Sequence, residues 1–128
     1  MAVPRPGVQE RILLHLRDYI DHADKVEVPF ALSQMGIANA VAIARSNVPR
    51  AIAGMREQGH LIERQAHVTG VSRKRKAYFL TEDGANIAND IWSKVSTQPV
   101  RLVHPDGRSE TLELAQALEA TDLPLRHV

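Results

Sequence analysis

The chain has 128 residues, of which 44% are hydrophobic and 24% charged, and its formal net charge is +1. This length and composition fit one compact domain with a modest core, with or without a small appendage. Cysteine is absent, which excludes a disulfide framework and a thiolate zinc site and suits a reducing compartment. No apolar run approaches the roughly 20 residues of a membrane-spanning helix, and the start "MAVPRPGVQE" lacks the apolar core of a signal peptide. We therefore expect a cytoplasmic protein that is not associated with a membrane.

Charge is unevenly distributed along the chain. Between Ile43 and Thr81 there are eight basic residues and two acidic ones, so this segment carries +6 and the remainder −5. A positive field over one region of a nearly neutral molecule is typical of a surface that attracts a polyanion. A chance cluster of charges on a solvated face would give the same pattern, so charge alone leaves both interpretations open.

The first third of the chain predicts two helices with a minimal strand between them. The segment "VQERILLHLRDYIDH" has helical spacing, and "KVEVPF" is short, β-branched and closed by a proline. In "LSQMGIANAVAI", Ser33 is a suitable N-cap for a short helix that ends near Val41, with Met35, Ala38 and Val41 facing inward. The apolar stripe expected on the first helix consists of Val8, Ile12, Leu13, Leu16, Tyr19 and Ile20.

The next segment, "ARSNVPRAIAGMREQGHL", has helical spacing although it contains a proline. If Ser46 is the N-cap, Pro49 falls in the first turn, where backbone N–H groups have no acceptor within the helix and proline is tolerated. We therefore predict a helix over about 46–58 that ends at Gly59 in the left-handed conformation.

A hairpin and a third long helix are predicted next. The β-like runs "HLIERQAHV" and "KAYFLT" lie on either side of "TGVSRKR", which predicts a hairpin over about 61–81 with a basic tip. Thr81 is a suitable N-cap for "EDGANIANDIWSKV", whose inward stripe would be Ile87, Ile91 and Val95. Trp92 lies beside this stripe, where it would either pack against the first helix or anchor a protein interface.

The C-terminal part predicts a smaller unit. The turn signal "HPDGR" lies between two apolar stretches and indicates a second hairpin, followed by a short helix in "AQALEATD". The apolar ending "LPLRHV" suggests that the chain is the front part of a longer one. We predict one domain over residues 1–95 and a C-terminal extension over residues 96–128.

This order of elements resembles the winged helix-turn-helix domain, particularly its MarR-like versions, among which archaeal regulators are the most similar. The resemblance lies in "LSQMGIANAVAIARSNVPRAIAGMREQGHLIE" and in "VTGVSRKRKAYFLTEDG", and with the first helix it covers more than half of the chain. It implies an α+β fold that is mainly helical, with a three-helix core, a two- to three-stranded wing, a C-terminal helix and a small C-terminal hairpin. Ala42, Ala44 and Pro49 replace the serine or glycine common in the family, so the turn is expected to be tighter or more helical.

The resemblance implies that the second helix of the motif enters the major groove of double-stranded DNA. With Val48, Ala51, Ile52 and Met55 buried, its outer face would present Ser46, Asn47, Arg50, Ala53, Gly54 and Glu57. Asn47 and Arg50 are suited to read bases, whereas Arg45 and Ser46 would hold phosphate at the helix N-terminus. A capping role for Asn47 and an ordinary solvated position for Arg50 are the alternatives.

The tip of the wing carries four consecutive basic residues, Arg73, Lys74, Arg75 and Lys76. Because side chains alternate along a strand, either Arg73 and Arg75 or Lys74 and Lys76 would share the surface that meets DNA phosphates. A solubilising loop is the alternative interpretation of the same residues.

Other chemistries have little support in the sequence. The six histidines lack the spacing of zinc ligands and are expected on the surface, and no nucleophile motif or phosphate-binding glycine loop is present. We therefore expect that the protein is not an enzyme and that it binds no metal and no cofactor. The favoured function is that of a DNA-binding transcription regulator, or the DNA-binding module of one, acting as a homodimer. The alternative is an RNA-binding or protein-interaction module that reuses the same fold.

Overall fold

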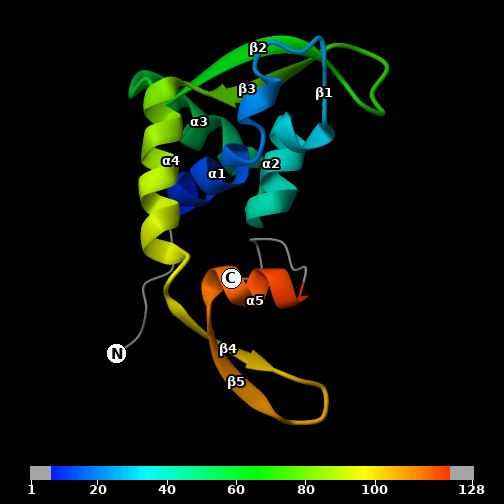
Figure 1. Cartoon of the computed structure of the whole chain (residues 1–128). Coiled ribbons are helices and arrows are strands. Elements are labelled where there is room, and N and C mark those ends of the chain that lie inside the picture. The colour runs from blue at the N-terminus through cyan, green and yellow to red at the C-terminus, as the bar shows by residue number, and fades with distance from the viewer. Residues whose placement is uncertain (1–6, 122–128) are drawn as a thin grey trace.

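The computed structural model describes residues 7–121, with side chains for residues 7–117 (Figure 1). The apolar ending at residues 123–128, which suggested a longer chain, lies outside the described residues. In chain order the elements are α1 (Val8–Arg17), η1 (Ile20–His22), β1 (Glu27–Val28), η2 (Phe30–Leu32), α2 (Gln34–Val41), η3 (Arg45–Asn47), α3 (Val48–Glu57), β2 (Leu61–Val68), β3 (Arg75–Leu80), α4 (Glu82–Val95), β4 (Pro99–Val103), β5 (Ser109–Glu113) and α5 (Leu114–Thr121), where η marks a 3₁₀ turn.

The strands form two small sheets near opposite ends of the molecule (Figure 1). In the first, β2 and β3 form the predicted antiparallel hairpin, with Glu63 opposite Tyr78, and the two-residue strand β1 adds to β2 in parallel. In the second, β4 and β5 form the predicted C-terminal hairpin. The α+β class and the order of elements predicted from the sequence are confirmed.

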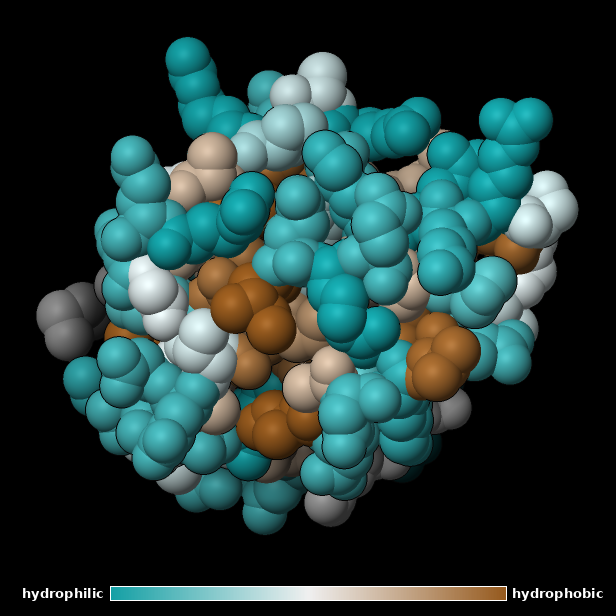
Figure 2. Space-filling model, turned by 90° about the horizontal axis from the view of Figure 1, so that it is seen from above, coloured by the Kyte–Doolittle hydropathy of each residue, from teal (hydrophilic) through white to brown (hydrophobic). Residues whose placement is uncertain are grey.

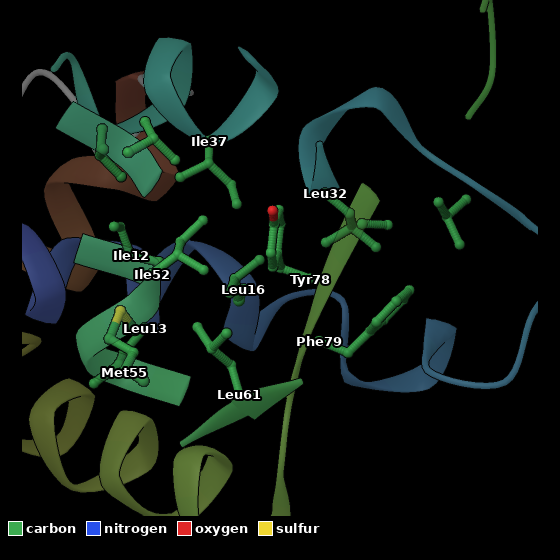
Figure 3. Packing of buried hydrophobic residues seen from close by; sticks show 14 of the residues in the cluster. Ile12, Leu13, Leu16, Leu32, Ile37, Ile52, Met55, Leu61, Tyr78 and Phe79 are labelled. Atoms are coloured by element: carbon green, nitrogen blue, oxygen red, sulfur yellow. The ribbon is translucent and has the colours of Figure 1, made fainter. Parts of the chain in front are cut away.

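The main core lies between the helices and the inner face of the first sheet. Ile12 and Leu16 of α1, Ile52 of α3 and Tyr78 of β3 are each at most 2% exposed. Figure 3 shows the Tyr78 ring among Ile37, Leu16 and Leu32, with Met55 and Leu61 packed nearby. Burying one such side chain contributes about 1.5–3 kcal/mol, so this cluster holds α3 and the wing in a fixed relation.

The predicted stripe of the first helix is only partly correct. Tyr19 leaves helical geometry, with φ −121°, so α1 ends at Arg17 and a 3₁₀ turn follows. Val8 and Ile20, predicted inside, are 38% and 44% exposed. Leu14, which lies off the stripe, is buried because the C-terminal extension covers that side of α1.

The predicted cap of α2 is confirmed, although its inward face differs from the prediction. The Ser33 hydroxyl accepts a hydrogen bond from Gly36 N at 3.1 Å and donates one to Phe30 O at 2.6 Å. A Cβ atom on Gly36 would lie 2.0 Å from Phe30 O, which explains a glycine inside this helix. Met35, predicted inside, is 42% exposed, because Ile37 occupies the buried position.

The start of α4 repeats this arrangement. The Thr81 hydroxyl accepts a hydrogen bond from Gly84 N at 3.0 Å and donates one to Gly59 O at 2.6 Å, which confirms Thr81 as the N-cap. A Cβ atom on Gly84 would lie 1.8 Å from His60 O. The "LTEDG" segment therefore joins the end of the wing closely to the end of α3.

The C-terminal extension packs on α1 and α4 through a second apolar cluster. Leu14, Val95 and Leu114 are its buried members, and Trp92 packs against them. The Arg17 guanidinium lies 5.5 Å from the centroid of the Trp92 ring. Trp92 thus packs within the chain, against the first helix, while a role in an interface and the predicted boundary at residue 95 stay predictions.

One histidine was wrongly expected on the surface. His15 is half-buried, and its Nε2 donates a hydrogen bond to the carbonyl of Ala31 at 2.8 Å. Burial lowers the pKa of His15, with the Ala31 bond acting in the opposite direction. This hydrogen bond joins α1 to the turn that precedes α2, so His15 contributes to the packing of the fold.

Candidate nucleic-acid interface

The turn between α2 and α3 depends on one alanine in a conformation that L-residues seldom adopt. Ala42 has φ 57° and ψ 49°, and its N–H donates to Ala38 O at the end of α2. In this left-handed region the Cβ atom crowds the backbone, which costs roughly 1–2 kcal/mol. The chain then extends at Ala44 and enters η3 directly, so α3 begins soon after α2 ends.

The start of α3 differs from the prediction at one residue. Ser46 is not the N-cap, because the helical region begins earlier, in the 3₁₀ turn Arg45–Asn47 that follows Ala44. Pro49 lies in the first turn of α3, as predicted. Its missing N–H would have bonded the Arg45 carbonyl, which instead accepts from Val48 N, and this i to i−3 bond explains the tighter turn. Gly59 has φ 76° after the helix, as predicted.

The outer face of α3 agrees with the prediction except at Gly54. Val48, Ile52 and Met55 are at most 2% exposed, whereas Arg50 faces solvent. The Asn47 side chain makes no cap hydrogen bond, so the structure does not show the capping role that was the alternative interpretation of this residue. The other outward positions are Ser46, Ala53 and Glu57, while Gly54 is half-buried beside Gln9.

Two of the eight basic residues of the positive segment have partners within the chain, although Arg56 is itself exposed. Arg56 pairs with Glu63 at 3.6 Å. The Arg64 guanidinium donates to the carbonyls of Ala23 and Lys25 at 2.9 and 2.8 Å and lies 4.5 Å from the Phe79 ring. The other six are exposed and make no ion pair with the described residues: Arg45, Arg50, Arg73, Lys74, Arg75 and Lys76.

The wing brings part of this charge to the helix-turn-helix motif. Strand β3 begins only at Arg75, so Arg73 and Lys74 lie in the irregular connection and the predicted alternation does not extend to them. Arg75 and Lys76 line the same open hollow of about 530 Å³ as Arg45. Three basic residues from two distant segments therefore surround one space.

Three residues that line this hollow, Phe30, Gln34 and Met35, were not predicted as site residues from the sequence. Gln34 opens α2, and Phe30 and Met35 are 38% and 42% exposed on its apolar part. The sequence signal that could have indicated Gln34 was its position directly after the Ser33 cap, at the start of α2. Figure 2 looks down on the end of the molecule that carries the first sheet, where hydrophilic residues cover most of the face and hydrophobic ones lie in a few places between them.

The arrangement of these elements matches solved structures of transcription regulators. ZitR of Lactococcus lactis, a zinc-responsive MarR family member whose wild type was solved in complex with DNA, has 22% sequence identity and a TM-score of 0.51, with 73% of this chain and 54% of ZitR covered. MepR of Staphylococcus aureus, a transcription regulator of the multidrug efflux pump MepA, has 18% identity and a TM-score of 0.50, with 69% and 56% covered. The fold is the MarR-like winged helix.

The likeness to MarR-like structures extends over part of those proteins, since the chain spans a little more than half of their length. No protein-family model and no curated protein matches the chain. The predicted similarity to archaeal regulators stays a prediction.

Two further properties concern the described residues only. No three of their histidine and acidic side chains lie together in a group that could hold a metal ion. None of their helices is long and apolar enough to span a membrane.

Proposed function

We propose that this chain binds double-stranded DNA through α3 and the wing, as a transcription regulator or as the DNA-binding module of one. The observation that carries the proposal is the shared hollow, which is lined by Arg45 before α3 and by Arg75 and Lys76 of the wing. A phosphate backbone that runs between the helix and the wing would contact all three. Phosphate contacts of this kind provide most of the affinity and fix the register of the protein on the duplex.

The start of α3 supports the reading of bases. Asn47 and Arg50 are exposed and make no hydrogen bond with their side chains to the described residues. Arginine pairs in a bidentate manner with guanine and asparagine with adenine, each contributing roughly 1–3 kcal/mol of discrimination. The small Ala53 on the same face allows the helix to approach the groove closely.

The wing assignment is tested with the double variant Arg73→Ala, Arg75→Ala in titrations of a labelled mixed-sequence duplex over a series of salt concentrations. The variant is expected to bind all duplexes more weakly and to reduce the slope of log affinity against log salt by about 0.9 for each phosphate that the wing no longer neutralises. The double variant Lys94→Ala, Arg101→Ala is the control, because it removes equal charge from exposed positions outside the basic segment. Equal affinity of parent and wing variant at every salt concentration would refute the wing assignment.

The nucleic acid itself is tested by comparing a duplex DNA with a structured RNA of equal length at matched salt. We expect the duplex to bind more tightly, since an α-helix enters the major groove of B-form DNA but not the narrow major groove of A-form RNA. A preference for RNA would favour the alternative function.

We further propose that the chain acts as a homodimer, because one recognition helix and one wing offer few contacts and two-fold operators match two-fold dimers. Sedimentation of the isolated chain, with and without a palindromic duplex, is expected to show two protein copies for each duplex. One copy for each duplex would contradict the proposal.

A further inference from the structure

A chain of polar side chains links the wing to both helices of the motif through the buried Tyr78. Tyr78 is 1% exposed, yet its hydroxyl oxygen lies 3.0 Å from Nε2 of Gln34 and 2.9 Å from Oε1 of Glu63. The same Glu63 oxygen lies 3.6 Å from Nη1 of Arg56. The four residues belong to α2, β3, β2 and α3, so the chain joins both helices of the motif to both strands of the wing. In Figure 3 the Tyr78 oxygen lies on the side of the ring where Ile37 of α2 is found.

The direction of the hydrogen bonds follows from the chemistry of the groups. A carboxylate only accepts, so the single hydroxyl hydrogen of Tyr78 goes to Glu63, and the tyrosine oxygen then accepts from the Gln34 amide. Burial raises the pKa of Tyr78, opposed by the bond from Gln34 and reinforced by Glu63, so the hydroxyl stays protonated at neutral pH and continues to donate. Arg56 provides a positive charge beside the Glu63 carboxylate.

Packing of the ring does not explain why residue 78 is a tyrosine, with a hydroxyl group. A phenylalanine would fill the same space among Leu16, Leu32 and Ile37 without placing a polar atom in the core. A buried hydroxyl is unfavourable unless it is hydrogen-bonded, whereas a fully satisfied network makes the elements it joins more rigid. The benefit of Tyr78 over phenylalanine therefore lies in what its two hydrogen bonds connect.

The connected elements are those that carry the candidate DNA contacts. Tyr78 follows Lys76 by two residues on β3, Gln34 lines the hollow with Arg45, and Arg56 lies on α3. A change in the angle between the wing and α2 would move Lys76 away from Arg45. The hydrogen bond between Tyr78 and Gln34 crosses this junction.

We propose that Tyr78 is a positioning residue for DNA binding, whose hydroxyl holds the wing at the angle that lets Arg75 and Lys76 share phosphates with Arg45. This inference rests on the proposed function, since it assigns a role within the same interface. Tyr78 itself does not touch the DNA and acts through Gln34 and Glu63.

The test uses Tyr78→Phe, which removes the hydroxyl and keeps the ring. Its affinity for a mixed-sequence duplex is expected to fall about fivefold, the equivalent of one hydrogen bond, at a temperature where the variant is fully folded. The slope of log affinity against log salt is negative, and its magnitude should decrease by about 0.9 to 1.8, because the displaced wing no longer neutralises one or two phosphates. Purely structural damage would not change this slope. Tyr19→Phe is the matched control, since the Tyr19 hydroxyl makes no hydrogen bond to the described residues and its removal should change neither quantity.

A second pair of variants separates the hydrogen bond from the charge and serves if Tyr78→Phe does not fold. Glu63→Gln and Glu63→Leu remove the same charge, but only the glutamine keeps an acceptor for Tyr78. Glu63→Gln is expected to bind DNA more tightly than Glu63→Leu and to keep the slope of the parent. Equal affinities and slopes of the two variants would overturn the proposal.

Amide hydrogen exchange provides a readout that needs no DNA. In Tyr78→Phe, the amides of β3 and of the first turn of α2 should exchange faster than in Tyr19→Phe, because the bridge between them is removed. Unchanged exchange, with a parent that binds duplex DNA, would overturn the positioning role alone. A parent that binds no duplex would overturn the proposed function together with the DNA role of Tyr78, while faster exchange would still show that the hydroxyl joins the wing to α2.

Discussion

The N-termini of α2 and α4 differ from that of α3 in how the chain satisfies them. At the first two, a hydroxyl caps the helix and also bonds the carbonyl of the preceding segment, while a glycine three residues later allows a close backbone approach. Neither η3 nor α3 has a side-chain cap at its start, and the side chains there face solvent.

This difference separates helix ends that hold the fold together from one whose side chains face solvent. The first N–H groups of a helix carry partial positive charge and attract anions, so an uncapped end beside Arg45 and Arg50 suits a phosphate. We call the capped N-termini of α2 and α4 the closed ends, because each is bonded to the segment before it. The uncapped start of α3 is the open end.

Gly84→Ala breaks a closed end. Its Cβ would lie 1.8 Å from the backbone oxygen of His60, so the backbone must shift, and we expect a loss of about 3 kcal/mol in the free energy of unfolding. Urea denaturation measures this quantity. Gly54→Ala is the control, because its Cβ meets only the flexible end of Gln9 at 3.0 Å and alanine favours a helix by about 1 kcal/mol. Similar effects of the two substitutions would contradict the close approach at Gly84.

Arg50→Ala changes the open end. A duplex selected from a random pool provides the reference, and the variant should lose about 2 kcal/mol of discrimination at one base pair, with little change at the others. Binding titrations against single-base variants of the duplex measure this. Lys94→Ala is the control for loss of one exposed charge outside the basic segment. A uniform loss across all duplexes would assign Arg50 to phosphate rather than to a base.

Ser33→Ala and Ser46→Ala compare a capping serine with an exposed one. Loss of the Ser33 cap should cost about 1 kcal/mol in the free energy of unfolding, whereas Ser46→Ala should change it by less than about 0.5 kcal/mol. Thermal denaturation at equal protein concentration ranks the two variants. If Ser46→Ala proves as destabilising as Ser33→Ala, Ser46 caps α3 after all.

Ala42→Gly relieves the left-handed turn that leads to the open end. Removing the Cβ strain at φ 57° should outweigh the greater freedom of glycine in the unfolded chain, for a net stabilisation of about 0.5 kcal/mol. The midpoint of urea denaturation should rise, with Ala40→Gly inside α2 as a control that lowers it. A lower midpoint for Ala42→Gly would show that the turn carries no such strain.

The helix ends that were predicted correctly are those that follow from three or four neighbouring residues. The caps at Ser33 and Thr81, the position of Pro49 in a first turn and the left-handed Gly59 each depend on bonds within one turn of chain. The prediction of Ser46 as the N-cap was wrong because the same residues suit both a 3₁₀ turn and the first turn of an α-helix. The local sequence does not distinguish strongly between the two.

Within the candidate interface, the positions of the charged residues and the apolar face of α3 follow from the amino-acid sequence alone. The tertiary structure was needed to show that Arg56 and Arg64 have partners within the chain, that Arg45 lines the same hollow as the wing, and that Tyr78 joins α2 to Glu63. These two groups of features differ in the range of the interactions that produce them. Periodicity and capping act over a few residues, whereas these contacts join segments up to 44 residues apart and form only when the core brings the elements together.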